Sequence, residues 1–124
     1  MKAGDAFQLV GVADKHLWIV ISDPAADPSR VLFVNFTTYG PLEDQTVILG
    51  PTDHSFIQHK TCVAYSRCRE ANGAGLEKLR QSGRLQLYDP VSPELLQRLR
   101  QGAADSPRAK IGHVQLLRDQ GLIE

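Results

Sequence analysis

Two of the four histidines in this chain lie five residues apart, in one short loop between strand-like segments. His54 and His59 belong to the stretch GPTDHSFIQHK (50–60), and Asp53 and Lys60 stand directly beside them. Imidazole gains and loses a proton near neutral pH and also ligates metal ions. The stretch therefore suits acid–base chemistry or metal binding, although an isolated histidine in a loop is more often a plain polar residue.

Other polar side chains stand where strand-like runs begin or end. His16 opens the run HLWIVIS (16–22), and Thr37 and Thr38 close the run VLFVNFTTY (31–39). Threonine is common in strands for its β-branched shape alone, so neither threonine by itself indicates a site. Only the combination of histidines, hydroxyls and charges at strand ends indicates one.

A further strand is predicted for TCVAYSRC (61–68). Because side chains alternate between the two faces of a strand, Tyr65, Arg67 and Arg69 are expected on one face. The opposite face would carry Cys62 and other small residues, which suits a core. We therefore predict that Tyr65 and Arg67 contact a substrate.

A metal site is an alternative interpretation of the histidines. His54 and His59, together with Asp53 and His16, offer enough side chains for zinc or manganese. However, a His-x4-His spacing in a loop is no recognised ligand frame, and the sequence contains no HExxH motif. The chain has two cysteines, Cys62 and Cys68, and no second cysteine pair that would complete a structural zinc site. Both are predicted to be ordinary reduced thiols, with Cys62 buried. We predict no bound metal and no cofactor, and a metal-dependent hydrolase stays an alternative.

The elements that must position these residues are mostly strands in the first two-thirds of the chain. Strand-like runs with short connections between them favour a small antiparallel sheet or barrel. They are AFQLVGVA (6–13), HLWIVIS (16–22), VLFVNFTTY (31–39), QTVILG (45–50) and TCVAYSRC (61–68), and RLQLYDP (84–90) could add another.

Helices are expected toward the C-terminus. GAGLEKLRQSG (73–83) contains a short helical pattern, and a clearer helix is predicted from Ser92 as N-cap, with Pro93 in its first position and Gly102 at its end. A last helix is expected after Ser106-Pro107, closed by Gly121. The predicted fold class is thus mainly β with C-terminal helices.

Composition narrows the classes of function. The chain has 124 residues, 42% of them hydrophobic, and fourteen basic side chains balance fourteen acidic ones. A neutral protein is a poor candidate for coating nucleic acid non-specifically, since that needs many phosphate contacts. No apolar run approaches a membrane span, and the first ten residues lack the features of a secretion signal. We therefore predict a cytoplasmic protein with no membrane partner.

The order of these segments resembles that of the MazF/PemK-type endoribonuclease toxins, which share a small SH3-like β-barrel with the CcdB toxins. The similar segments are KAGDAFQL (2–9), HLWIVISDP (16–24), VLFVNFTT (31–38) and KTCVAYSRCR (60–69), followed by a closing helix in SPELLQRLRQGA (92–103). The likeness spans roughly residues 2–102. It implies an SH3-like barrel with its closing helix over 1–102 and a helical extension over 103–124.

The resemblance also implies an activity: metal-independent cleavage of single-stranded RNA, in which the ribose 2′-hydroxyl attacks the adjacent phosphate. His16 stands where the family commonly has an arginine followed by proline, and Thr37 or Thr38 stands where it has a threonine. A histidine there suits acid–base catalysis, and His59 is expected to face His16 across a groove. The predicted catalytic residues are His16, Thr38 and His59, and the predicted substrate-binding residues are Thr37, Asp53, His54, Lys60, Tyr65 and Arg67.

The partners implied by the family are single-stranded RNA, a second copy of the chain in a homodimer, and an antitoxin whose disordered acidic segment fills the RNA groove. A second interpretation is a non-catalytic barrel that binds a protein or a nucleic acid, because SH3-like barrels host many functions. The absent arginine and the zero net charge favour this alternative.

Overall fold

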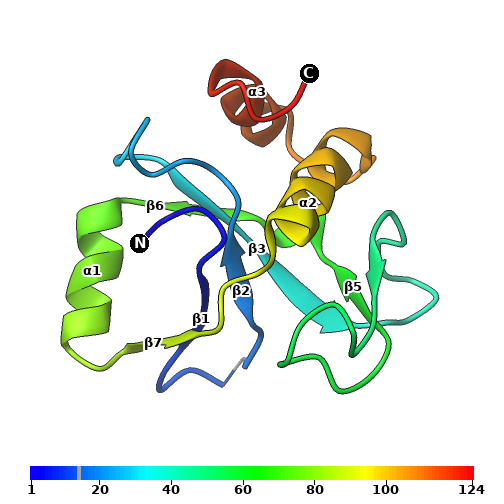
Figure 1. The fold of residues 1–124 in the computed structure, drawn as a ribbon, viewed down its shortest axis with the longest axis horizontal. Coiled ribbons are helices and arrows are strands. Elements are labelled where there is room, and N and C mark those ends of the chain that lie inside the picture. The colour runs from blue at the N-terminus through cyan, green and yellow to red at the C-terminus, as the bar shows by residue number, and fades with distance from the viewer. Residues whose placement is uncertain (14) are drawn as a thin grey trace.

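An antiparallel sheet of seven short strands forms the framework of the protein (Figure 1). The computed structural model describes residues 1–13 and 15–124. The strands are β1 (Ala6–Leu9), β2 (Trp18–Val20), β3 (Val31–Thr38), β4 (Ile48–Leu49), β5 (Thr61–Val63), β6 (Arg69–Ala71) and β7 (Leu85–Tyr88). The helices are α1 (Gly73–Gln81), α2 (Pro93–Asp105) and α3 (Ile111–Asp119). The domain is therefore mixed α/β rather than mainly β, although its sheet is antiparallel as predicted.

The sheet is open. Its strand order is β4-β5-β3-β2-β1-β7, with β6 paired to β3 beside this path. In the part of the chain that the structure describes, β4 and β7 end the order without pairing to each other. The closed SH3-like barrel implied by the resemblance is thus not confirmed.

Strand β3 is the centre of the sheet. It pairs with β2 along one edge, and along the other edge its end pairs with β5 and its start with β6. A short 3-10 turn, η1 (Tyr65–Arg67), separates β5 from β6. The prediction of one continuous strand over 61–68 was therefore wrong, and the alternation that put Tyr65 on one face with Arg67 does not hold.

The two faces of the sheet are covered by different helices (Figure 1). Neighbouring residues of β2 point to opposite faces, so Ile19 joins the larger core while Trp18 joins the smaller one. The larger core includes Leu95 and Leu99 of α2 and Leu116 and Leu117 of α3. The smaller core includes Phe7, Phe33, Leu85 and Leu76 of α1. Burial on both faces explains why the run around β2 is apolar without alternation.

Helix α2 begins as predicted but ends later. The Ser92 side chain accepts a hydrogen bond from the backbone N–H of Leu95 at 3.1 Å, and Pro93 occupies the first helical position. The helix then continues through Gly102 to Asp105. Gly102 is buried inside the helix, where its missing side chain lets α2 approach Tyr65 closely.

The C-terminal residues complete the larger core. Helix α3 begins at Ile111 rather than directly after Ser106-Pro107, and Gly121 follows its end with a positive φ of 72°. Leu116, Leu117 and Ile123 all belong to the larger core. The tail over 103–124 thus packs on the same core as the sheet.

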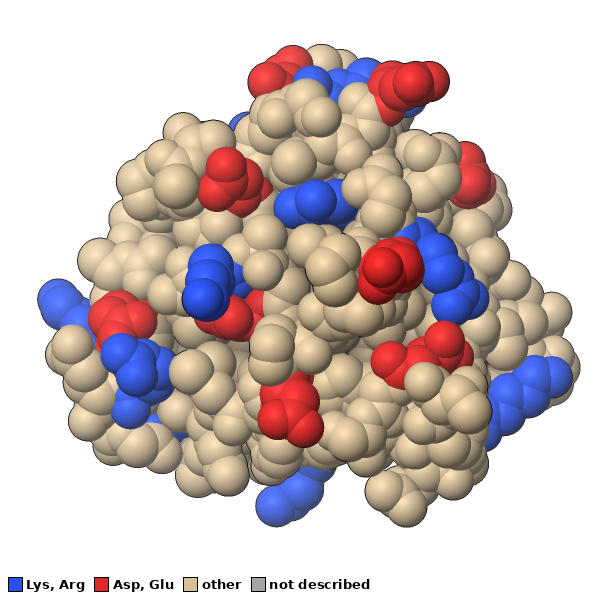
Figure 2. Space-filling model, viewed as in Figure 1, with Lys and Arg blue, Asp and Glu red and all other residues tan. Residues whose placement is uncertain are grey.

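Surface charge is mixed in sign. On the face that Figure 2 shows, basic and acidic side chains are interspersed. Such a surface gives little long-range attraction for a polyanion, so any nucleic-acid site depends on local groups. None of the helices in the described residues has the length and apolar character needed to cross a bilayer.

Candidate functional site

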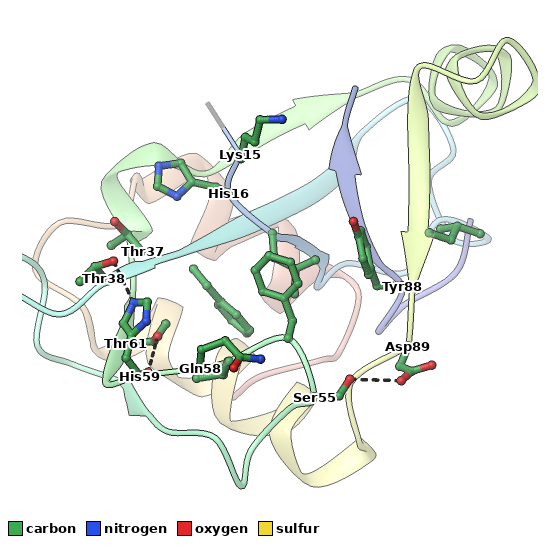
Figure 3. Close-up of a pocket in the computed structure, with 15 residues that line it drawn as sticks. Lys15, His16, Thr37, Thr38, Ser55, Gln58, His59, Thr61, Tyr88 and Asp89 are labelled. Atoms are coloured by element: carbon green, nitrogen blue, oxygen red, sulfur yellow. Dashed lines mark hydrogen bonds between the residues drawn. The ribbon is translucent and has the colours of Figure 1, made fainter. Parts of the chain in front are cut away.

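A pocket of about 910 Å³ lies between the end of β3, the segment before β2, the loop before β5 and the end of β7 (Figure 3). This volume falls within the range of sites for small ligands. The pocket has an apolar part formed by Leu17, Phe36, Phe56, Ile57 and Leu87. Its polar lining residues are Lys15, His16, Thr37, Thr38, Ser55, Gln58, His59, Thr61, Tyr88 and Asp89.

Sheet pairing brings His16 to the pocket. Strands β2 and β3 are antiparallel, with Trp18 opposite Asn35, and the backbone N–H of Phe36 donates to the carbonyl of Leu17 at 3.0 Å. The segment before β2 therefore runs beside the end of β3. Figure 3 shows His16 and Thr37 near each other on one side of the pocket.

The other pocket histidine is held by β3 and β5. The register places Thr38 opposite Thr61. The Thr38 hydroxyl lies 3.0 Å from Nε2 of His59, and the Thr61 hydroxyl donates to the His59 carbonyl at 2.9 Å. Both the ring and the backbone of His59 are thus positioned by hydrogen bonds. Figure 3 shows Thr37 and Thr38 between the two imidazoles.

His54 plays a different part from the one predicted. It is buried, and its Nε2 lies 2.6 Å from the carbonyl of Asp89. Its Nδ1 accepts the backbone N–H of Phe56 at 3.0 Å. These two partners require a neutral ring with its proton on Nε2. His54 therefore clamps the loop before β5 to the end of β7, behind the pocket lining.

The side of the pocket near β7 is aromatic and acidic. The rings of Phe56 and Tyr88 form an edge-to-face pair with centroids 5.5 Å apart. The Tyr88 hydroxyl donates to the Gln8 side chain at 2.7 Å, which restrains the ring. The Ser55 hydroxyl donates to Oδ2 of Asp89 at 3.1 Å, so the carboxylate is also oriented.

Four of the residues predicted for the site share this pocket: His16, Thr37, Thr38 and His59. The structure brings these residues together from three separate segments, as their strand-end positions suggested.

The other predicted site residues have different surroundings. Asp53 accepts the Gly50 backbone N–H at 2.8 Å and also pairs with Arg98 on α2. The ammonium group of Lys60 lies 3.9 Å from the centre of the Tyr39 ring. Asp53 and Lys60 thus make these contacts elsewhere, and neither residue lines the pocket.

The η1 turn explains the positions of Tyr65 and Arg67. Tyr65 is fully buried, its hydroxyl donates to the Leu99 carbonyl at 2.7 Å, and burial raises its pKa far above the usual range. Arg67 is exposed, with its guanidinium 3.8 Å from Glu43. Tyr65 is thus a core residue and offers no surface to a substrate.

Several lining residues were missed from the sequence. Lys15 precedes His16 directly, and Gln58 precedes His59, so both lie next to predicted residues. Tyr88 is the last residue of β7, and Asp89 follows it directly. Both therefore stand at a strand end, which is the same kind of position that indicated His16 and Thr38. The missing information was that this strand pairs with β1 and so reaches the pocket.

In the described part of the chain, the histidines and acids are not grouped as a metal centre. Among residues 1–13 and 15–124, no three histidine, cysteine, aspartate or glutamate side chains are grouped as metal ligands. Asp53 and His54 are engaged elsewhere, which removes half of the ligand set that the metal alternative required. Both cysteines are buried and reduced, as predicted for Cys62. Burial raises the pKa of the Cys62 thiol, and it raises the pKa of Cys68 to about 12. Neither thiol is suited to act as a nucleophile.

No protein-family model, no characterised protein and no solved structure matches this chain. The likeness to the MazF/PemK toxins, with the activity and partners that it implies, therefore stays a prediction. The chemistry of the pocket is the remaining guide to function.

Proposed function

We propose that this protein is a metal-independent endoribonuclease that cleaves single-stranded RNA in this pocket. One observation carries the proposal: His16 and His59 line the same pocket, with the hydroxyls of Thr37 and Thr38 beside them. Two imidazoles near a phosphate supply both proton transfers of RNA cleavage without any further group.

The proposed reaction is a transesterification. One imidazole, neutral at the start, removes the proton of a ribose 2′-hydroxyl, and the oxygen attacks the adjacent phosphorus. The other imidazole, protonated at the start, donates its proton to the departing 5′-oxygen. The P–O5′ bond breaks as the P–O2′ bond forms, which leaves a 2′,3′-cyclic phosphate and a 5′-hydroxyl end.

The neighbouring groups suit the phosphate. The Thr38 hydroxyl contacts the ring of His59, and the Thr37 hydroxyl is a second donor on the same side of the pocket. Lys15 is the lysine that lines the pocket, and we assign it the contact with the phosphate in place of Lys60, which was predicted to bind substrate. A cation and oriented hydroxyl donors stabilise the charge that develops on the phosphate oxygens in the transition state.

An unpaired strand is the substrate that fits. The bases of single-stranded RNA can be splayed apart and stacked on aromatic side chains, whereas those of a duplex are already stacked. Phe56 and Tyr88 offer such side chains within the pocket. The toxin-like interpretation adds a homodimer and an antitoxin, whose acidic disordered segment would compete with RNA for this pocket.

The test is incubation of the purified protein with a mixed-sequence RNA in excess EDTA, with analysis of the product ends. We expect wild-type protein to produce cyclic phosphate ends. His16→Ala and His59→Ala should each lose about 100-fold or more in rate while keeping the wild-type circular dichroism spectrum, because each removes one proton transfer.

Two lysine variants form a matched pair for the phosphate. Lys15→Ala should slow cleavage, whereas Lys60→Ala, which removes the same charge outside the pocket lining, should leave the rate unchanged. Cleavage that survives both histidine substitutions would refute the proposal. RNA binding without cleavage, with or without added metal, would instead favour the non-catalytic binding module.

A further inference from the structure

We propose that the end of the pocket near β7 is a base-recognition site that selects guanine. This inference rests on the proposed function only in assuming that the pocket receives a nucleic-acid strand. The site consists of Ser55, Phe56, Tyr88 and Asp89. Ser55, Tyr88 and Asp89 lie across the pocket from the histidines (Figure 3). None of these residues is used in the proposed cleavage step.

Asp89 lines the pocket, and its carboxylate is oriented by Ser55. Its Oδ2 accepts the Ser55 hydroxyl at 3.1 Å, and its Oδ1 accepts no hydrogen bond from the described residues. The residue itself is exposed. A carboxylate only accepts hydrogen bonds, and each of its two oxygens has two acceptor positions. Three positions of Asp89 therefore stay open, which is enough for two donors of a ligand.

The nearby rings provide a surface for a flat ligand. Phe56 and Tyr88 are both partly buried, and both line the pocket. Their edge-to-face contact and the bond from Tyr88 to Gln8 hold the rings in place before any ligand arrives. Base stacking on aromatic side chains is favourable for every base. The rings therefore contribute affinity, and the discrimination between bases must come from Asp89.

Guanine is the base whose pairing edge matches a carboxylate. Its N1–H and its exocyclic N2 amine are two adjacent donors that point the same way, and they meet two carboxylate oxygens side by side. Adenine and cytosine place an acceptor beside their single amine, and uracil places carbonyls on both sides of its N3–H. Each of these acceptors would face the negative Asp89 oxygens, so all three bases are disfavoured.

The buried His54 supports the same site from behind. Its two ring nitrogens bond the backbone of Phe56 and of Asp89, which are the stacking and the selecting residues. His54 is therefore a positioning residue, which fixes the distance between the ring and the carboxylate. Preorganisation of this kind strengthens discrimination, because the site does not rearrange to suit another base.

The experiment measures binding separately from cleavage. The probes are fluorescein-labelled pentanucleotides in which 2′-fluorine replaces the attacking 2′-hydroxyl. Uracil occupies every position except the centre, which carries guanine, hypoxanthine (as inosine), adenine or cytosine. Fluorescence anisotropy with the full chain should show guanine bound about tenfold or more tightly than adenine or cytosine. Inosine, which lacks the N2 amine, should fall between them.

Two substitutions assign the preference to Asp89. Asp89→Asn should abolish the preference for guanine while the weaker binding of the other bases persists, because its amide presents a donor to guanine. Glu94→Gln removes one exposed carboxylate from α2, outside the pocket, and should leave the preference unchanged.

The outcomes separate this inference from the proposed function. Equal binding of all four probes, or a guanine preference that survives Asp89→Asn, would overturn the inference even if RNA is cleaved. A guanine preference that Asp89→Asn removes would support it, even in a protein that cleaves nothing.

Discussion

Gly102 gives the sharpest test of the packing that holds α2 against the sheet. It lies in the last turn of α2 and is buried, and a Cβ atom at this position would collide with the Tyr65 hydroxyl and with Cγ2 of Val47. We predict that Gly102→Ala destabilises the protein, although alanine is the better helix former at a generic position.

The magnitude follows from opposing effects. Alanine in place of glycine favours a helix by about 1 kcal/mol. Overpacking a buried site costs about 1–3 kcal/mol. Displacing the Tyr65 hydroxyl from the Leu99 carbonyl leaves a buried group unpaired, at a further cost of about 1–3 kcal/mol. The net expected loss in the free energy of unfolding is about 3 kcal/mol.

Urea denaturation followed by circular dichroism measures this loss. The matched control is Gly112→Ala in α3, where a Cβ atom meets nothing within 4 Å and where we expect a gain of about 0.5–1 kcal/mol. Tyr65→Phe alone should lower the free energy of unfolding. In the Gly102→Ala protein it should instead reduce the loss of stability, because it removes the oxygen that clashes with the new Cβ atom. A Gly102→Ala protein as stable as the wild type would refute the close approach of α2 to Tyr65.

Two further predictions concern buried and paired polar groups. His54→Ala should lower the free energy of unfolding by about 3 kcal/mol, because it leaves the Phe56 N–H and the Asp89 carbonyl unpaired. The control is His59→Ala at an exposed position, which should cost less than about 1 kcal/mol in the same urea titration. The hydrogen bond from Arg30 lowers the pKa of Glu70 below its ordinary 4.5, so the stability due to this carboxylate is complete above pH 4.5 and is lost as the pH falls through the lowered value. Thermal unfolding between about pH 5 and pH 3 should therefore depend less on pH in Glu70→Gln than in the wild type, and an unchanged pH dependence would contradict this assignment.

Local signals in the sequence were sufficient for most of the elements. Ser92 and Pro93 mark the start of α2 because capping and the fixed φ of proline act within one turn. The apolar runs around β2 and β3 were also recognisable, since burial on both faces leaves few polar residues in them. The end of α2 was mispredicted at Gly102, because the glycine serves contact with Tyr65 rather than termination.

The break between β5 and β6 had no local signal. The stretch TCVAYSRC alternates as a strand would, yet residues 65–67 form a 3-10 turn that directs the Tyr65 hydroxyl to Leu99 on α2. The partner lies 34 residues away in the chain. No window of sequence around Tyr65 contains the atom that decides its conformation.

For the candidate site, too, some features could be predicted from local sequence and others depend on strand pairing. Local sequence patterns were enough to place His16, Thr37, Thr38 and His59 at the ends of strand-like segments, because the alternation and length of those segments are local properties. Whether such ends meet depends on which strands pair and in which register. That choice is a balance of contacts over the whole sheet, which no single segment encodes.

Which side chains line the pocket and which lie behind its lining depends on contacts between segments that are distant in the chain. The tertiary structure brought in Lys15 and Asp89 through the pairing of β2 with β3 and of β7 with β1. It also separated the two histidines of GPTDHSFIQHK: His59 lines the pocket, whereas His54 is buried and joins two loops. Two identical side chains five residues apart acquire different roles because a hydrogen bond depends on distance in space, and folding sets that distance.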